Sequence, residues 1–142
     1  MTQETLWVVA GALAGPDETW LMHRRPYAKH HGGLWEFPGG KIEDAEIPVN
    51  ALLRELGEEL GVEVRESDCE PIAFAEDRSG ECEQAIVILL YTVGAWRGEP
   101  RALEGGDVGW FTPPEIARLD KPPLDCELAK RLFAVHYGGG QE

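Results

Sequence analysis

Three glutamates lie close together just before residue 60, at a spacing that would place their carboxylates on one side of a helix. Glu55, Glu58 and Glu59 follow a run of leucines in "ALLRELGEELGV". On a helix they fall within an arc of about 100°, beside the leucine stripe, where their like charges repel. A hard divalent ion such as Mg²⁺ takes oxygen ligands and would remove this repulsion. The spacing therefore predicts a magnesium platform, and a solvated acidic helix face is the alternative that it leaves open.

The helix that carries these glutamates has recognisable ends. Pro48 suits the first turn, where its missing N–H costs nothing, and Gly61 suits the position just past the last turn. Gly57 is unfavourable inside a helix, by about 1 kcal/mol against alanine, which indicates close packing at that point. Arg54 lies four residues before Glu58 and is placed to pair with a neighbouring glutamate and orient it.

The residues around this helix complete a longer pattern over residues 40–62. It reads G, five residues, E, seven residues, REL, one residue, EE, one residue, GV, which fixes nine positions in 23. Gly39 and Gly40, at its start, permit backbone geometry closed to other residues and let a carbonyl approach a ligand. The pattern resembles the box of the Nudix hydrolases, enzymes that cleave a nucleoside diphosphate linked to another moiety. The resemblance implies an α/β/α sandwich with a central mixed β-sheet and the box helix against it.

The sequence on both sides of the box narrows this resemblance. "RRP", "GLWEFPGGKIE", "GEP" before "LEGGDVGWF", and "PP" before the last helix are spread over almost the whole chain. Together they look like the MutT branch, whose members hydrolyse nucleoside triphosphates and often clear oxidised ones such as 8-oxo-dGTP. Close relatives with similar flanking sequence prefer pyrimidine triphosphates, so the resemblance leaves the preferred base open.

The resemblance implies a ligand set for the metal. In MutT-like enzymes the carbonyl at Gly39 and the carboxylates at Glu55, Glu58 and Glu59 hold the divalent ions, here expected to be Mg²⁺ with Mn²⁺ as a substitute. A glutamate from a distant loop joins them, and Glu104 in "ALEGGD" matches it. An ordinary charged loop residue is the alternative reading of Glu104.

The resemblance also implies which residues meet the substrate. Arg25 matches the arginine that reaches the nucleotide, and Phe37 matches an aromatic residue near the base, although it also suits the core. Two positions depart from the pattern: Asp125 replaces an asparagine that faces the base edge, and Gln84 replaces a basic residue. An ionised aspartate only accepts hydrogen bonds, so it favours base edges that offer N–H groups, such as guanine N1 and N2 or cytosine N4.

The expected reaction follows from these roles. Water attacks the β-phosphorus, and a nucleoside monophosphate and pyrophosphate are released, with Glu55 or a loop glutamate as general base and Glu58 as a key metal ligand. Arg54 orients the glutamates. Two other functions stay open: a Nudix enzyme for another diphosphate, such as ADP-ribose or a dinucleotide, and a non-catalytic nucleotide-sensing module.

Composition agrees with a single small enzyme. The chain has 142 residues, of which 43% are hydrophobic, enough for one core. We expect one domain over residues 1–137 and a disordered tail over residues 138–142. There is no charged-then-apolar leader and no apolar run near 18 residues, so neither secretion nor membrane insertion is indicated and the expected location is the cytoplasm.

The charge of the chain limits its partners. A net charge of −13 argues against polymeric nucleic acid, whose binding needs basic patches, but not against one nucleotide bridged by metal ions. Positive charges gather in "MHRRPYAKHH", residues 22–31. We expect Arg24 or Arg25 to face the substrate, and a solvated basic loop is the alternative.

Strands interspersed with two substantial helices favour a mixed sheet covered on both faces. The expected strands are 6–13, 20–25, 34–37, 62–64, 84–96 and 108–111, and the expected further helices are 113–119 and 125–137. "GPDET" supplies a turn between the first two strands, which are therefore expected to pair as a hairpin. Asp125 is a candidate N-cap of the last helix.

Overall fold

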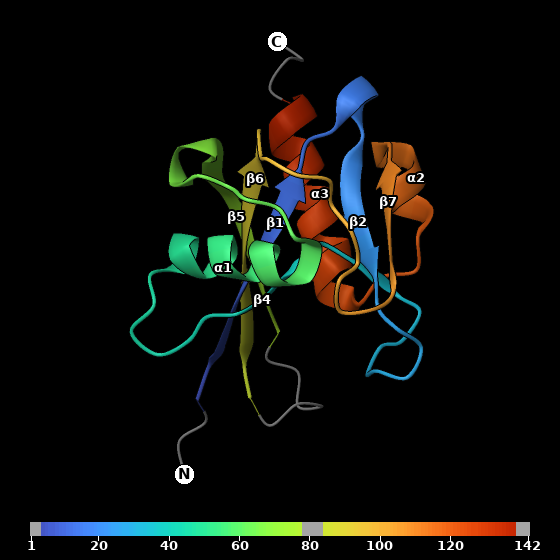
Figure 1. Cartoon of the computed structure of the whole chain (residues 1–142). Helices are drawn as coiled ribbons and strands as arrows, with labels where there is room; N and C mark the ends of the chain where they lie inside the picture. Colours follow the sequence, from blue (N-terminus) through green and yellow to red (C-terminus); the bar gives the residue numbers. More distant parts are fainter. Residues whose placement is uncertain (1–3, 78–83, 139–142) are drawn as a thin grey trace.

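The chain folds into strands interspersed with helices, as expected. A computed structural model describes residues 4–77 and 84–138 (Figure 1). In chain order the elements are β1 (Leu6–Leu13), η1 (Pro16–Glu18), β2 (Trp20–Arg24), β3 (Trp35–Glu36), β4 (Gly39–Lys41), α1 (Pro48–Leu60), η2 (Glu66–Asp68), β5 (Cys69–Asp77), β6 (Ile86–Val93), β7 (Asp107–Phe111), α2 (Pro113–Arg118) and α3 (Pro123–Gly138). Residues 139–142, which make up most of the expected tail, lie outside the described part of the chain.

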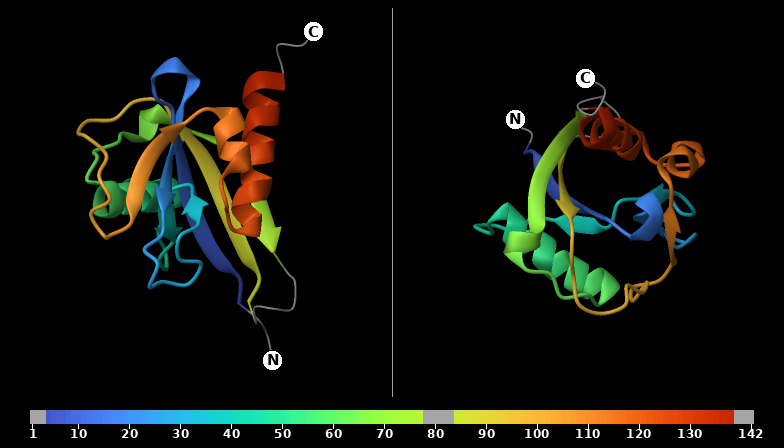
Figure 2. Two further views of the ribbon diagram at one scale, coloured as in Figure 1. Left: turned by 90° about the vertical axis from the view of Figure 1, so that its right-hand side faces the viewer. Right: turned by 90° about the horizontal axis from the view of Figure 1, so that it is seen from above.

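A mixed four-stranded sheet in the order β4-β1-β6-β5 forms the centre of the molecule. Its central strand, β1, runs antiparallel to β4 and parallel to β6, so that Val9 lies opposite both Gly40 and Leu89. A smaller antiparallel sheet, in the order β3-β2-β7, stands beside it. α1 covers one face of the large sheet and α3 the other (Figures 1 and 2), which confirms the α/β/α sandwich.

Alternate residues of β1 bind the two helical layers to the sheet. Val9 and Leu13 are buried in one cluster with the leucines of α1, whereas Ala10 and Ala12 belong to a second cluster with Leu128 and other residues of α3. This alternation is the two-residue period of a strand that is buried on both faces. The box helix is therefore fixed to the sheet by its leucine stripe, and its glutamates stand at the edge of that contact.

α1 begins and ends where the sequence predicts. Pro48 is its first residue, and Gly61 follows its last with a left-handed φ of 73° while its N–H bonds to the carbonyl of Gly57. The expectation of close packing at Gly57 is wrong. A Cβ at that position would meet only the carbonyl oxygen of Val62, at an ordinary contact distance of 3.7 Å.

The expected hairpin between the first two strands is wrong. Ala14, just after β1, forms an isolated bridge with Trp20, and β2 pairs instead with β3 and β7. The reason is that β1 is apolar on both faces, so it fits between two strands of the large sheet better than in a two-stranded hairpin.

Other element boundaries also differ from expectation. β5 was not expected, because it carries Pro71 and several charges, features typical of the edge strand that it is. The expected strand 62–64 is reduced to a single bridge between Glu63 and Arg97. α3 begins at Pro123, so Asp125 lies inside its first turn and is not the N-cap. None of the helices in the described residues has the length and apolar character needed to cross a bilayer.

Candidate active site on the box helix

The three glutamates of α1 pass from solvent into the protein along one side of the helix. The Glu58 side chain is 53% exposed, that of Glu55 is 18% exposed and that of Glu59 is 12% exposed. Leu52, Leu56 and Leu60 are fully buried beneath them, so the helix cannot rotate without exposing its apolar side. The three carboxylates therefore have fixed but unequal environments.

The glycines of β4 leave space for two of these carboxylates. The N–H of Gly39 donates to Oε1 of Glu59 at 3.0 Å, and a Cβ at Gly40 would lie 2.2 Å from the carboxyl carbon of Glu55. A Cβ at Gly39 would lie 1.9 Å from the carbonyl oxygen of Val9. Neither glycine has a left-handed φ, so the expectation of unusual backbone geometry is wrong. Both positions require glycine, because a side chain at Gly40 would collide with Glu55 of the helix and one at Gly39 with the backbone of β1.

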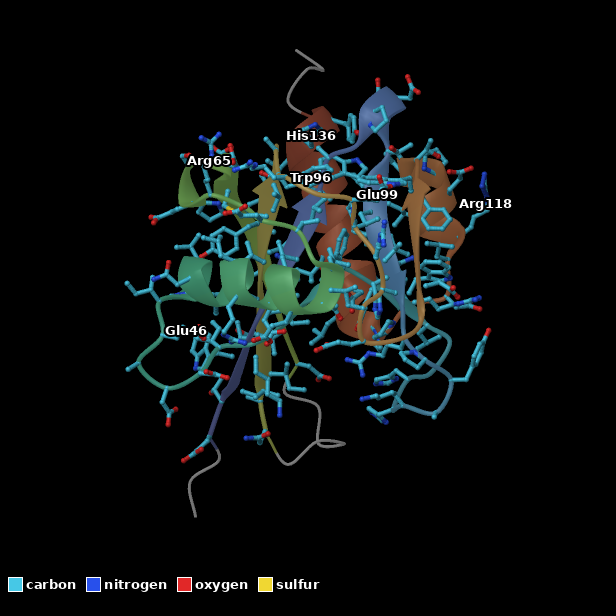
Figure 3. The ribbon with its side chains drawn as sticks, in the orientation of Figure 1. Glu46, Arg65, Trp96, Glu99, Arg118 and His136 are labelled. Atoms are coloured by element: carbon cyan, nitrogen blue, oxygen red, sulfur yellow. The ribbon has the colours of Figure 1, made fainter. Side chains whose placement is uncertain are left out.

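Arg54 is bonded to several acidic side chains at the other end of this group. Its Nε and Nη2 donate to the two oxygens of Glu46 at 2.9 and 3.0 Å, and Nη1 donates to Glu55 at 3.0 Å and to Glu58 at 3.3 Å. Nη2 also donates to the carbonyl of Lys41 at 3.0 Å. The expected pairing with a neighbouring glutamate is thereby confirmed. We call Arg54, Glu46, Glu55 and Glu58 the arginine cluster; Glu46 is labelled in Figure 3.

The pKa values in the arginine cluster move in two directions. Hydrogen bonds from Arg54 lower the pKa of Glu46 to about 2, which keeps it ionised. Burial raises the pKa of Glu55 against the opposing effect of the same guanidinium, and the negative charges of Glu58 and Glu104 add to the rise. Glu55 is thus the member of the cluster that most favours gaining a proton or a cation.

The loop between β6 and β7 brings Glu104 to the helix. The N–H of Leu103 donates to the carbonyl of Glu59, and that of Arg101 donates to the carbonyl of Leu60, both at 3.0 Å. Carbonyls in the last turn of a helix have no partner within it, so they bind the loop. The charge of Glu104 is close enough to affect the pKa of Glu55, as the expected ligand set requires.

A second acidic group surrounds a histidine that the sequence analysis did not select. Nδ1 of His23 on β2 lies 3.8 Å from Oε2 of Glu59 and 3.9 Å from Oε2 of Glu36. Its Nε2 bonds to the carbonyl of Gly105 at 3.0 Å, beside Glu104. We call His23, Glu36 and Glu59 the histidine cluster. A polar residue in the otherwise buried strand "WLMHR" was the available signal.

Burial and the attraction between its members act in opposite directions on the pKa values of the histidine cluster. Burial raises the pKa of Glu59 to about 7, against the opposing attraction of His23. For His23 burial acts to lower the pKa, but the attraction of Glu36 and Glu59 and the bond to Gly105 outweigh it, so the net direction is upward. His23 is only 4% exposed, and within the described residues its Nδ1 has no hydrogen-bond partner.

The two arginines expected to face the substrate are both held by acids. Arg24 is bonded to Asp107 through Nε at 3.1 Å and through Nη2, and its guanidinium lies over the ring of Trp35. Arg25 donates through Nε to Oε1 of Glu36 at 2.9 Å and through Nη1 to the carbonyl of His30 at 3.0 Å. Arg25 therefore touches the histidine cluster, and its contact with a nucleotide stays a prediction.

Phe37 and Asp125 lie together, whereas Gln84 lies apart. The N–H of Phe37 donates to Oδ1 of Asp125 at 3.1 Å, and burial raises the pKa of Asp125 to about 7. The side chain of Phe37 is 3% exposed and lies in the core cluster with α3. Gln84 is exposed just before β6, and no hydrogen bond or ion pair among the described residues joins it to the others. Substrate contact by these three residues stays a prediction.

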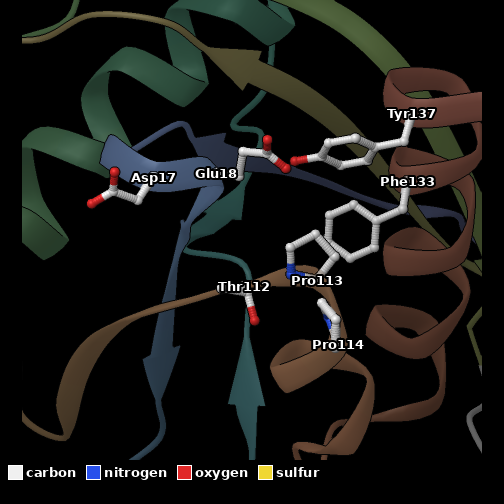
Figure 4. Close-up of a pocket in the computed structure, with 7 residues that line it drawn as sticks. All are labelled: Asp17, Glu18, Thr112, Pro113, Pro114, Phe133 and Tyr137. Atoms are coloured by element: carbon white, nitrogen blue, oxygen red, sulfur yellow. The ribbon is translucent and has the colours of Figure 1, made fainter. Parts of the chain in front are cut away.

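A separate hollow of about 640 Å³ lies between η1, α2 and α3 (Figure 4). It is lined by Asp17, Glu18, Thr112, Pro113, Pro114, Phe133 and Tyr137. None of these residues belongs to either cluster. The candidate active site lies instead on the surface of α1, where clustered carboxylates and the space left by Gly40 suit a divalent metal ion.

Comparison with known proteins agrees with this geometry. The chain is 46% identical over 100 residues to an 8-oxo-dGTP diphosphatase of Proteus vulgaris, covering 70% of this chain and 85% of the relative. It is 31% identical over 128 residues to a CTP pyrophosphohydrolase of Escherichia coli, covering 89% and 91%. The solution structure of the E. coli ORF135 protein superposes with a TM-score of 0.85 at 29% identity, covering 99% and 96%. A family model of the NUDIX domain matches residues 5–132, so the chain belongs to the Nudix family.

Proposed function

We propose that this protein is a MutT-like nucleoside triphosphate pyrophosphohydrolase that uses Mg²⁺, or Mn²⁺ in its place. Its proposed substrates are (deoxy)nucleoside triphosphates, among them oxidised ones such as 8-oxo-dGTP, and its products are the monophosphate and pyrophosphate. The observation that carries the proposal is the meeting of Glu55, Glu58 and Glu59 with the Glu104 loop above Gly40. The relative from Proteus vulgaris named 8-oxo-dGTP diphosphatase supports the same reaction.

The residues that would hold the metal are the carbonyl of Gly39 and the carboxylates of Glu55, Glu58, Glu59 and Glu104. Nudix hydrolases generally need a divalent metal. When bound, it offsets the charge of the triphosphate, favours ionisation of the attacking water and stabilises the leaving group. We assign the role of general base to Glu55, because its carboxylate is 18% exposed and is held beside the other proposed ligands by Arg54 at 3.0 Å.

Arg54 has a positioning role in this proposal. It is bonded to Glu55 and Glu58 and is itself anchored by Glu46 and the carbonyl of Lys41. A guanidinium held on two sides fixes the carboxylates it touches, which lowers the reorganisation needed when charge develops on the substrate.

Attack at the β-phosphorus is the expected course of hydrolysis. Reaction in ¹⁸O-labelled water tests it, because β-attack places the label only in pyrophosphate. Label in the monophosphate would instead show attack at the α-phosphorus.

Asp125 is proposed to read the base edge beside Phe37 and Arg25. Its Oδ1 accepts from the backbone of Phe37, which leaves Oδ2 for a ligand. With a pKa of about 7, the carboxyl group is partly protonated near neutral pH and can then donate as well as accept. Gln84 is proposed as a weaker contact in place of a basic residue. This arrangement accommodates guanine-like or cytosine edges.

The deciding experiment measures pyrophosphate release with Mg²⁺ and ranks substrates by kcat/KM. The panel is 8-oxo-dGTP, dGTP, CTP, dCTP and 5-methyl-dCTP, with ADP-ribose followed by its own products. We expect 8-oxo-dGTP to lead. If cytidine nucleotides lead, the reaction stands but the base preference follows the E. coli relative named CTP pyrophosphohydrolase. Hydrolysis of ADP-ribose alone, or of none of these compounds, contradicts the proposal.

The predictions for the extent of the domain, the binding partner and the cellular location are part of this proposal. We propose that residues 1–137 form one domain, which the match over residues 5–132 supports. Binding of a small nucleotide rather than polymeric nucleic acid and a location in the cytoplasm stay predictions.

A further inference from the structure

The histidine cluster has the construction of a metal site. The N–H of Gly39 holds Oε1 of Glu59, and Nε of Arg25 holds Oε1 of Glu36. The other oxygen of each carboxylate, Oε2, faces Nδ1 of His23 at 3.8 and 3.9 Å. Each acid is thus anchored through one oxygen and presents the second to the same point.

The hydrogen bond of His23 fixes which ring nitrogen carries a proton. A backbone carbonyl only accepts, so the nitrogen bonded to Gly105 at 3.0 Å is Nε2–H. In the neutral ring Nδ1 then carries a lone pair, and it is aimed at the two carboxylates. Histidines that bind metals usually donate their second ring N–H to a carbonyl or a carboxylate in this way.

Direct hydrogen bonding does not account for Nδ1. Its distances to both carboxylates exceed hydrogen-bond length, and the side chain is 4% exposed. A buried polar atom without a partner costs about 1–3 kcal/mol, a penalty that a bound cation removes. The three ligand atoms lie within 4.8 Å of one another. With bonds of about 2.0–2.2 Å to a metal, movements of less than about 1 Å would close the site.

We infer that His23, Glu36 and Glu59 form a second divalent-cation site, in which one imidazole nitrogen and two carboxylate oxygens bind a transition-metal ion. Mg²⁺ prefers oxygen ligands throughout, whereas Mn²⁺, Co²⁺ and Zn²⁺ accept imidazole. The inference shares Glu59 with the proposed magnesium site but needs no nucleotide and no catalysis. It adds His23 and Glu36, which the box pattern does not contain.

Pulsed electron paramagnetic resonance of Mn²⁺ bound to the whole chain, without nucleotide, tests this site directly. A directly bound imidazole gives a ¹⁴N coupling that carboxylates cannot give. We expect the coupling in the wild type and its loss in His23→Gln, which keeps an N–H for Gly105 and removes Nδ1. His136→Gln, which removes an exposed histidine from α3, should retain it. Mn²⁺ affinity at this site should fall at least about tenfold in His23→Gln.

Two results would overturn the inference. One is Mn²⁺ bound to the wild type with no imidazole coupling, as a protonated His23 paired with the two acids would give. The other is a coupling that survives in a folded His23→Gln. If that variant does not fold, Glu36→Gln replaces it and should weaken the coupled signal, and an unchanged signal contradicts the site. Pyrophosphate release by the wild type with Mg²⁺ is measured in parallel, so failure of the second site and failure of the proposed function remain distinguishable.

Discussion

The arginine cluster and the histidine cluster stand side by side at α1, and their acidic groups are neutralised in opposite ways. Around Arg54 one guanidinium donates to three carboxylates at 2.9 to 3.3 Å, and the side chain is 25% exposed. Around His23 an imidazole faces two carboxylates without bonding to either, in a place that is almost fully buried. In the first cluster the arginine bonds to every carboxylate, whereas in the second Nδ1 of His23 has no hydrogen bond to either acid among the described residues.

This difference suits the arginine cluster to orienting carboxylates and the histidine cluster to binding a cation. An arginine fork satisfies carboxylate oxygens in a fixed plane, so Glu46 is held ionised as a structural anchor. Glu59 has no such fork, and burial brings its pKa to about 7. A buried carboxylate with no arginine partner gains more from a bound cation than one that is already paired with arginine. Glu55 and Glu58 belong to the arginine cluster but adjoin Glu59, so the proposed active site lies where the two clusters meet.

The largest expected effect is a loss of catalysis when Glu58, the most exposed of the three carboxylates on α1, is changed. Glu58→Gln should lower kcat by about 10²-fold or more, because the variant loses a charged metal ligand while keeping the shape of the side chain. Steady-state pyrophosphate release with Mg²⁺ measures it. Glu43→Gln is the matched control, since Glu43 is 69% exposed and 3.9 Å from Arg54, and it should keep near wild-type turnover. Equal losses in the two variants would mean that the total negative charge of this region, rather than metal ligation by Glu58, supports turnover.

The arginine cluster itself is tested by Arg54→Lys. Lysine keeps the charge but cannot donate to Glu46, Glu55 and Glu58 at once, so the carboxylates lose their fixed positions. We expect a fall of about 10- to 100-fold in activity or Mg²⁺ affinity. Arg97→Lys changes an arginine that is 86% exposed and pairs with Glu63, outside both clusters, and it should behave as wild type. If Arg54→Lys is fully active, the positive charge of Arg54 is sufficient and its several hydrogen bonds are not needed.

The two clusters also predict opposite dependences of stability on pH. The lowered pKa of Glu46 contributes stability that is present above about pH 4.5 and is lost as pH falls toward 2. Asp125 lies beside the histidine cluster, and burial and the charge of Glu36 raise its pKa to about 7. Its contribution is complete below about pH 4 and is lost as pH rises through 7, at up to about 1.4 kcal/mol per pH unit. Without metal, maximum stability should fall between these windows.

Asp125→Asn isolates the second of these contributions. The variant keeps an oxygen for the N–H of Phe37 but cannot titrate, so the fall in unfolding free energy between about pH 4 and 7 should become shallower. Urea unfolding at several pH values measures this slope. Asp44→Asn, at an exposed position, should leave the slope unchanged. An unchanged slope in Asp125→Asn would assign the pH dependence to Glu59 and His23.

Local spacing was sufficient to predict the pairing within the helix that is part of the arginine cluster, but not the bonds of Arg54 to Glu46. The pairing of Arg54 with Glu58 follows from four residues on one helix, and both ends of that helix follow from Pro48 and Gly61. The approach of Glu104 required resemblance to a family, because a loop 45 residues beyond Glu59 carries it. These features depend on one element, or on one motif, and so they could be expected from the sequence.

The histidine cluster could not be predicted in the same way. His23 meets Glu36 through the pairing of β2 with β3, and it meets Glu59 only because α1 packs across the sheets. Pairing between strands depends on long-range burial, and here the expected hairpin of β1 with β2 was wrong. The apolar residues before His23 indicate a buried histidine, but without the correct neighbours of β2 they do not indicate which acids it meets.

The smallest expected effect comes from a position of α1 that belongs to neither cluster. A Cβ at Gly57 would meet only the carbonyl oxygen of Val62 at 3.7 Å, so Gly57→Ala should stabilise the helix by about 0.5–1 kcal/mol and leave kcat unchanged. Urea unfolding and turnover measure the two quantities. Gly40→Ala is the contrast, because its Cβ would press on the carboxylate of Glu55 and should lower activity. If Gly57→Ala also lowers activity, the functional surface of α1 extends beyond the two clusters, because the added methyl group has ample space in the folded chain.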